Sequence, residues 1–285
     1  MHSIEIKETG DRFWIPEHLG ECSRKQYLDM AKLILTYQIK AISYETFRIM
    51  ALYLLMNMEY KENNLEEIEE VKMQNVYITS EVLDSFFEED ENGKKHLIQD
   101  YVHNPVKFIK YKFGKFHGPE DAFKDITWKQ LIEGLGEVQS FANDGDLKRL
   151  TRLFAMFYLR KGETLSDINL DKRVKYFKYL DIRYIYGFYL LFVSFWRFLT
   201  TNAVVEIDGK DIDLTLLFTR ESKGEGESEY TELGLRSTSY QIAESGVFGT
   251  MKELNETNAW EILINMYDMM VRNEKRNAEL EKTEE

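Results

Sequence analysis

The sequence contains little that could cross-link the chain or bind a metal ion. Cys22 is the only cysteine among 285 residues, so no disulfide can form within the chain and no thiolate cluster can hold a metal ion. The five histidines are scattered, and none has the spacing of a zinc motif such as H-E-x-x-H. We therefore expect no metal ion and no other cofactor, and the single cysteine indicates a reducing compartment.

Proline and long apolar runs are also scarce. Only three prolines interrupt the chain, which leaves room for long helices because proline breaks a helix interior. The most apolar run, between Arg183 and Arg197, is shorter than the roughly 18 residues that a membrane-spanning helix needs. The first five residues are neither basic nor apolar enough for a leader peptide. These features predict a soluble chain without a membrane partner.

The balance of charge argues against nucleic acid as a partner. The formal net charge is −13 at pH 7, whereas binding to phosphate depends on lysine and arginine. Residues 106–115 (V-K-F-I-K-Y-K-F-G-K) depart from this balance, since they carry four lysines among aromatic residues. Such a stretch is typical of an amphipathic element with a solvated lysine face, and the alternative is a dock for an acidic partner.

Sequence signatures of enzymes are missing. The chain contains no G-x-x-x-x-G-K phosphate loop and no G-x-S-x-G nucleophile motif. Residues 167–171 begin like a calcium loop, but Lys172 occupies the position of the required glycine, so helix capping explains them better. The glycines of G-L-G at 134–136 lie inside a helical stripe and are predicted to permit close helix packing. We predict no catalytic residue, no small-molecule substrate and a chain that is not an enzyme.

Helical periodicity dominates what is present. Ser23 with Gln26 and Thr127 with Gln130 have the spacing of capping boxes, which mark helix starts. The pattern over 128–157, broken by N-D-G, predicts two antiparallel helices joined by a short turn. The residues expected to face each other across this α-hairpin are Trp128, Leu131, Leu135 and Val138 on the first helix and Leu150, Phe154 and Phe157 on the second.

The fold class predicted from these patterns is mainly α. We expect a helical bundle with one or two small β-hairpins, forming a single mostly helical domain over 1–285. Alternating residues predict hairpins at 4–15 and near 203–215, and Asp208-Gly209 is a typical hairpin turn in the second. A helix over 47–58 is apolar nearly all round, which is typical of the centre of a bundle.

Other segments are predicted to lack regular structure. Polar and glycine-rich residues predict a mobile loop near 221–239. The charged tail at 272–285 is expected to fray. Weak patterns around 79–87 and 97–113 indicate charged connections between helices.

An apolar pair between two glycines stands out near the end of the chain, ahead of a helix expected to start at Asn258. Phe248, in this pair, has two interpretations: a core plug that locks the last helix to the domain, or an anchor for a partner. Under the second interpretation the partner-binding residues are Val247, Phe248, Trp260 and Tyr267.

Three blocks, at 24–34, 125–160 and 242–267, resemble in their order the tail-region proteins that tailed phages and prophages encode near the tape-measure gene. Lys161-Gly162 departs from the family, many of whose members have a proline there. The resemblance implies a non-enzymatic tail assembly or structural protein that acts through protein–protein contacts. Its implied partners are other phage tail proteins or copies of itself.

The resemblance also implies a place for the protein. It would be found in the host bacterial cytoplasm during assembly, and whether it then stays in the virion is left open. Two other functions remain alternatives. One is a helical adaptor or binding module unrelated to virions, and the other is an enzyme with no recognisable motif.

Overall fold

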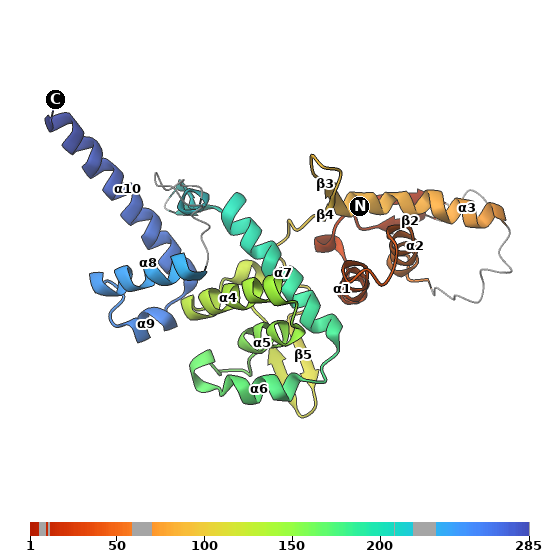
Figure 1. Cartoon of the computed structure of the whole chain (residues 1–285), viewed down its shortest axis with the longest axis horizontal. Coiled ribbons are helices and arrows are strands. Elements are labelled where there is room, and N and C mark those ends of the chain that lie inside the picture. The colour runs from red at the N-terminus through yellow and green to blue at the C-terminus, as the bar shows by residue number, and fades with distance from the viewer. Residues whose placement is uncertain (6–9, 11, 59–69, 208, 219–231, 285) are drawn as a thin grey trace. The chain divides into compact units, whose positions relative to one another are not determined.

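The computed structural model describes residues 1–5, 10, 12–58, 70–207, 209–218 and 232–284. Within these residues the chain forms ten α-helices and four two-stranded antiparallel sheets (Figure 1). The predicted mainly α fold with small β-hairpins is therefore confirmed. None of the helices in this described part combines the length and the apolar character that crossing a membrane requires.

The chain groups into two compact units. Unit 1 consists of Met1–Val106 and Leu180–Phe192, and unit 2 consists of Lys107–Tyr179 and Val193–Glu285. The helix α7 (Ile182–Thr201) contributes its first part to unit 1 and the remainder to unit 2. The single domain over 1–285 stays a prediction, because two units of one chain can still fold cooperatively.

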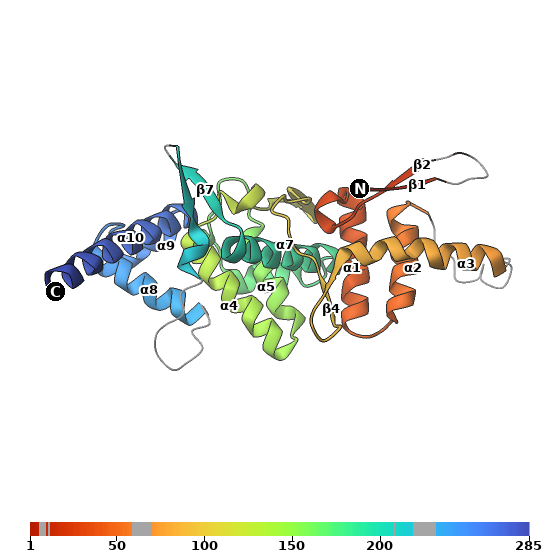
Figure 2. The same cartoon turned by 90° about the horizontal axis from the view of Figure 1, so that it is seen from above.

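Unit 1 contains three of the helices and two of the hairpins. Its elements are β1 (His2–Glu5), β2 (Arg12–Ile15), α1 (Arg24–Gln38), α2 (Tyr44–Leu55), α3 (Glu70–Thr79), β3 (Phe87–Glu89) and β4 (Lys95–Leu97). The β1–β2 pairing confirms the hairpin predicted at 4–15. The capping box of Ser23 and Gln26 is also confirmed, and it fixes the start of α1. Figure 2 shows α1 and α2 side by side, with α3 crossing them.

The core of unit 1 contains a buried hydrogen-bonded pair of tyrosines. The Tyr27 hydroxyl donates to the backbone oxygen of Gly187 at 2.7 Å and lies 2.9 Å from the Tyr101 hydroxyl. Gly187 permits this approach, since a Cβ there would lie 3.1 Å from Tyr27 Cε1. Burial raises the pKa of Tyr27 well above its ordinary value, so the hydroxyl stays neutral and can donate.

We expect Tyr27→Phe to lower the free energy of unfolding by about 1–3 kcal/mol, because the buried oxygen of Gly187 loses its donor. Urea unfolding followed by far-ultraviolet circular dichroism measures the change. Tyr101→Phe is the control, since it leaves the bond to Gly187 intact and should cost no more than about 1.5 kcal/mol. Equal losses in the two variants would contradict the assigned direction of the bond.

Unit 2 holds the remaining elements. They are β5 (Phe108–Tyr111), β6 (Gly114–His117), α4 (Trp128–Asp144), α5 (Leu147–Phe157), α6 (Leu170–Phe177), β7 (Val204–Ile207), β8 (Lys210–Asp213), α8 (Glu232–Ser245), α9 (Met251–Glu256) and α10 (Ala259–Glu284). The β7–β8 pairing confirms the hairpin predicted near 203–215, although Asp208 of its expected turn lies outside the described residues.

The predicted α-hairpin is confirmed by α4 and α5, which lie side by side in Figure 1. The capping box of Thr127 and Gln130 starts α4, and Gly145 ends it with a φ of 67° that favours glycine. Asp146 then caps α5. Six of the residues predicted to face each other are buried, namely Trp128, Leu131, Leu135, Leu150, Phe154 and Phe157. Val138 is only half-buried.

The start of α10 is hydrogen-bonded to the segment before α4, and we call this set of bonds the clasp. The Trp260 indole donates to the Ala122 oxygen at 3.0 Å, and the Asn258 amide donates to the Lys124 oxygen at 2.7 Å. Two backbone bonds, one from residue 259 to 126 and one from 128 to 257, complete it. Ala122 and Phe123 both adopt left-handed φ values, 54° and 53°, which are strained for residues other than glycine. The clasp therefore holds a strained loop in place.

Three sequence predictions of irregular structure are corrected. The helix α8 begins at Glu232, so residues 232–239 of the predicted mobile loop are helical, while 219–231 lie outside the described residues. Leu235 and Ile242 account for this helix, because both are buried on one of its faces. Near the end of the chain, α10 continues to Glu284, so the charged residues 272–284 are helical.

The third correction concerns the two charged connections. The segment 79–87 forms a 3-10 helix over Ser80–Phe86 and enters β3, and 97–113 includes all of β5. Leu83 and Phe86 are buried in unit 1, and Ile109 is buried in unit 2. Burial of these apolar side chains stabilises elements that the charged residues around them obscured in the sequence.

Candidate functional site

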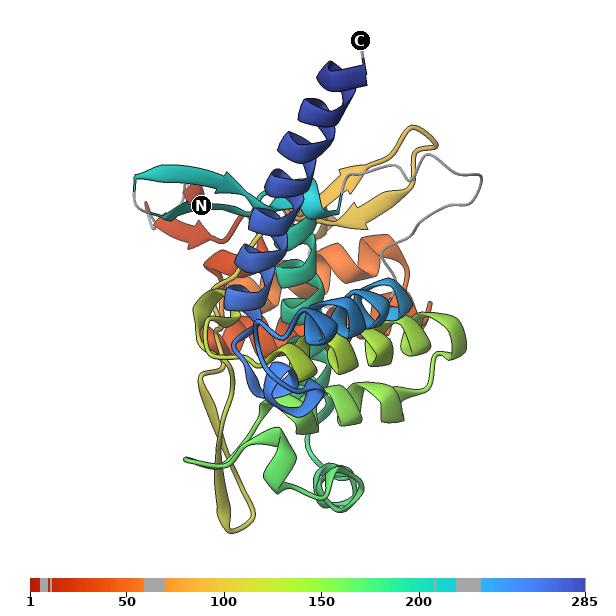
Figure 3. The same cartoon turned by 90° about the vertical axis from the view of Figure 1, so that its left-hand side faces the viewer.

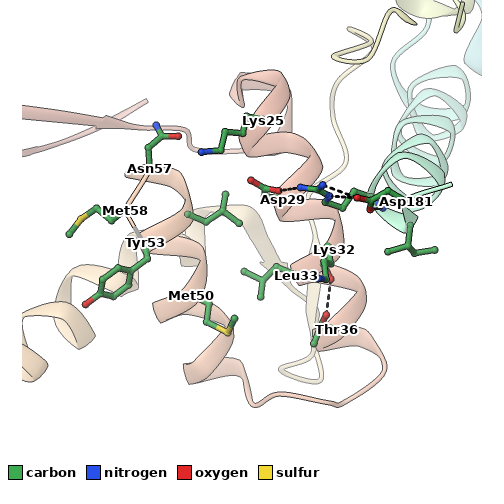
Figure 4. Close-up of a pocket in the computed structure, with 13 residues that line it drawn as sticks. Lys25, Asp29, Lys32, Leu33, Thr36, Met50, Tyr53, Asn57, Met58 and Asp181 are labelled. Carbon is green, nitrogen blue, oxygen red and sulfur yellow. Dashed lines mark hydrogen bonds and ion pairs between the residues drawn. The ribbon is translucent and has the colours of Figure 1, made fainter. Parts of the chain in front are cut away.

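A groove of about 580 Å³ lies between α1 and α2 in unit 1, beside the first residues of α7 (Figure 4). Its apolar lining consists of Leu33, Met50, Tyr53, Leu54, Met58 and Ile182. Charged side chains of α1 and of the start of α7 surround this lining. We call it the α1–α2 groove.

The helical repeat explains why these side chains share one hollow. Lys25, Asp29, Lys32 and Thr36 recur every three or four residues, so they lie along one face of α1. The opposite face of α1 is occupied by core residues such as Met30. The groove therefore lies on the part of α1 that the core leaves uncovered.

The burial of α2 corrects the prediction of a central helix at 47–58. Phe47, Ala51 and Leu55 are buried, but Met50 is only partly buried and Met58 is 51% exposed. An all-round apolar sequence thus serves two surfaces, a core face and a groove face. The sequence signal for this groove was the excess of apolar residues in 47–58. Apolar residues beyond those that a core needs can line a binding groove, and the prediction of a central helix did not take this into account.

Arg183 joins the two carboxylates that line the α1–α2 groove. Its guanidinium lies 2.6 Å from Asp29 Oδ1 and 2.7 Å from Asp181 Oδ2. The hydrogen bond that Arg183 donates lowers the pKa of Asp181, and the bonds that Asp181 and then Asp29 accept raise the pKa of Arg183. Asp181 is therefore ionised at neutral pH, and both acids are already paired with Arg183, which leaves neither placed as a general acid.

The two lysines of the groove, unlike Arg183, are not paired with any carboxylate that the structure describes. Lys25 and Lys32 are exposed and lie seven residues apart, which is two turns of α1. No ion pair within the described residues involves either of them. The groove thus combines an apolar floor with two positive charges on its rim.

The predicted partner-binding pair lies in the turn between α8 and α9 of unit 2. Gly246 and Gly249 have φ values of 73° and 76°, which explains why glycine stands at both positions. Val247 is 61% exposed, whereas Phe248 is half-buried. Phe248 is therefore neither a fully buried plug nor a fully exposed anchor, and both interpretations stay predictions.

The other two predicted partner-binding residues lie two turns apart on α10. Asn258 accepts a bond from the Trp260 backbone at 2.8 Å, in agreement with the predicted helix start. Trp260 is half-buried and belongs to the clasp through its indole, and Tyr267 is half-buried further along. Ring contacts and hydrogen bonds of the described residues do not join Phe248 to either of them. The indole N–H of Trp260 thus has a structural role within the clasp.

We expect Phe248→Ala to lower the free energy of unfolding by about 1–2 kcal/mol, less than a fully buried phenylalanine would cost, because its ring is half-buried. Thermal and urea unfolding measure the loss, and Val247→Ala is the control, expected within about 0.5 kcal/mol of the parent because that side chain is exposed. A loss above about 3 kcal/mol would identify a core plug. No loss at all would favour the anchor.

The described residues offer no group of three or more histidine, cysteine, aspartate or glutamate side chains that could hold a metal ion. Cys22 is buried, and burial raises the pKa of its thiol to about 12, so it is not a reactive thiolate at neutral pH. Comparison with protein-family models, with characterised proteins and with solved structures gives no match for this chain.

Proposed function

We propose that the protein is a non-enzymatic phage tail assembly or structural protein that works through protein–protein contacts. The observation that carries the contact function is the α1–α2 groove, whose apolar floor is open and whose carboxylates are already paired with Arg183. The resemblance of the three sequence blocks supports the placement in a phage tail.

The chemistry of the groove suits an amphipathic helix from another tail protein. Such helices place apolar residues into a hydrophobic groove at intervals of three and four residues. Lys25 and Lys32, two turns apart on the rim, are spaced to meet carboxylates two turns apart on the incoming helix. Deep burial of apolar anchors would supply most of the affinity, and the lysines would set the orientation.

Deletion of the gene from the genome that carries it tests the tail function. We expect induced particles to lack complete tails in electron micrographs, and the parent gene supplied in trans should restore them. Mass spectrometry of purified particles then shows whether the chain stays in the virion or leaves after assembly. Normal tails and an unchanged infectious titre in the deletion would overturn the tail function.

A matched pair of variants tests the groove itself. Met50→Glu places a charge on the groove floor, and we expect it to fold like the parent but fail to restore tails. Ile39→Glu is the control, because Ile39 is 67% exposed at the end of α1 and does not line the groove. Restoration by both variants would show that the groove makes no essential contact.

A further inference from the structure

The β5–β6 hairpin of unit 2 carries the basic stretch that the sequence analysis singled out, and the α1–α2 groove does not use it. The two strands pair with Lys110 opposite Lys115 and Tyr111 opposite Gly114, so Lys112 and Phe113 form the turn. In Figures 1 and 3 this turn extends beyond the helices of unit 2, with the hairpin drawn in olive in Figure 3.

The inner face of the hairpin is fixed on α6. The Phe116 ring lies 4.9 Å from that of Phe177, and the Tyr111 ring lies 5.5 Å from that of Tyr176. Phe116 is completely buried. Because these aromatic contacts hold the hairpin, its outer face is presented in one orientation and does not have to be ordered on binding.

The outer face places two like charges directly opposite each other. Lys110 and Lys115 are cross-strand partners, and both are exposed. Like charges in this arrangement destabilise a hairpin, and the Phe108 ring, 4.5 Å from Lys115 Nζ, offsets part of the repulsion. Folding alone gives no reason to keep this pair.

The turn is equally unfavourable for folding. Two-residue hairpin turns favour Asn-Gly or Asp-Gly, because their central residues need left-handed φ values. Here Lys112 takes such a value, 50°, and Phe113 leaves its whole side chain in solvent, with a relative exposed area of 105%. An apolar ring in that position gains nothing from the fold of its own chain.

None of Lys110, Lys112 and Lys115 makes an ion pair in the part of the chain that the structure describes. By contrast, Lys107, at the base of the hairpin, pairs with Asp121. Lys112 instead donates to the Tyr176 oxygen at 3.4 Å and lies over the Tyr176 ring, so toward the tip no carboxylate of the described residues neutralises the three lysines. Three local costs, a repulsive pair, a strained lysine and an exposed phenylalanine, coincide at one place, which is typical of a binding site.

We propose that the tip of the β5–β6 hairpin docks onto an acidic segment of a partner protein, with Phe113 entering an apolar pocket and Lys110 and Lys115 meeting carboxylates beside it. The partner relieves two of these costs, since it buries the ring and neutralises the opposed lysines, while the left-handed Lys112 sets the turn that presents Phe113. This inference deepens the proposed function, on whose protein contacts it rests, by assigning a second surface and the chemistry of its partner.

Charge favours a protein segment over a nucleic acid or an anionic membrane. The whole chain has a net charge of −13, so the residues outside this basic hairpin are more negative still. A nucleic acid or a membrane extends far beyond the hairpin and would also face that excess of carboxylates. A short acidic segment meets only the hairpin, within the screening distance of about 8 Å at physiological ionic strength.

Binding of labelled probes to the purified full-length chain tests the proposal. Three fluorescent probes are compared by anisotropy: a peptide that alternates glutamate pairs with single leucines, single-stranded oligothymidylate, and vesicles of phosphatidylcholine with phosphatidylserine. We expect saturable binding of the peptide that weakens with added salt. Phe113→Ala and Lys110→Glu should each weaken it at least about tenfold.

Matched controls separate binding from folding. Trp14→Ala removes an exposed aromatic from the β1–β2 hairpin, and Lys210→Glu reverses a charge in the β7–β8 hairpin, so neither should change peptide binding. Lys110→Glu should at the same time raise the Tm by about 1–3 °C, because it replaces repulsion across the strands by attraction. A stabler protein that binds less well is the result that a merely structural lysine would not give.

Three results would overturn the inference: no saturable peptide binding, equal loss in the control variants, or tighter binding of oligothymidylate or vesicles than of the peptide. Its failure is distinguishable from that of the proposed function. If deletion of the gene leaves tails intact while the purified chain binds the peptide normally, only the proposed tail function is wrong. If the deletion gives defective tails while the purified chain does not bind the peptide, only the inference about the hairpin is wrong.

Discussion

Trp128→Ala is expected to lower the free energy of unfolding by about 3–5 kcal/mol, the largest effect of any single change considered for this chain. Trp128 is completely buried at the first position of α4. Its indole donates to Ser239 of α8 at 2.8 Å, and its backbone donates to the Thr257 oxygen within the clasp. Removing the ring leaves a cavity at the point where α4, α8 and the start of α10 meet.

Guanidinium unfolding followed by circular dichroism measures this loss. Trp128→Phe retains most of the volume but not the donor, so it should cost about 1–3 kcal/mol. Trp14→Ala is the matched control, because that tryptophan is 63% exposed and should change stability by less than about 0.5 kcal/mol. Similar losses for Trp14 and Trp128 would contradict the packing described for α4.

Leu135→Ala is expected to cost about 2–5 kcal/mol, because Leu135 is only 3% exposed on α4, the helix that pairs with α5. The spread reflects how far the two helices can close over the vacated space. Leu147→Ala, at the start of α5, is the control in the same α-hairpin. Leu147 is 43% exposed, so its truncation should cost less than about 1 kcal/mol. A loss below about 1 kcal/mol for Leu135 would mean that the two helices pair through another face.

Local signals in the sequence were sufficient where the interaction itself is local. The capping boxes at Ser23 and Thr127 each join residues three positions apart, so spacing alone identified both helix starts. The α-hairpin followed for the same reason, since its turn and its two stripes are contiguous. The β5–β6 hairpin escaped prediction because Lys112-Phe113 carries none of the turn chemistry that marks such hairpins in a sequence.

The candidate surfaces depend on contacts that no local pattern encodes. Sequence periodicity predicts a helix over 47–58 at the centre of a bundle, whereas Met50 of α2 and Met58 just beyond it line the α1–α2 groove. Trp260 was identified as a candidate partner residue, but its indole bond to Ala122 joins residues 138 positions apart. Such long-range pairings become visible only when the chain has folded.

The clasp also determines the order in which unit 2 can be completed during synthesis. Its bonds from Asn258 to Lys124 and from Trp260 to Ala122 span 134 and 138 positions. At about 5–20 residues per second, a ribosome needs on the order of ten seconds to reach the second partner after making the first. Throughout that interval Ala122 and Phe123 lack the clasp, although the Phe123 ring can already pack on Phe157 and Phe195. A nascent or prematurely terminated chain that stops short of residue 258 therefore lacks the clasp, and we expect proteases to cut this loop more readily than in the finished protein.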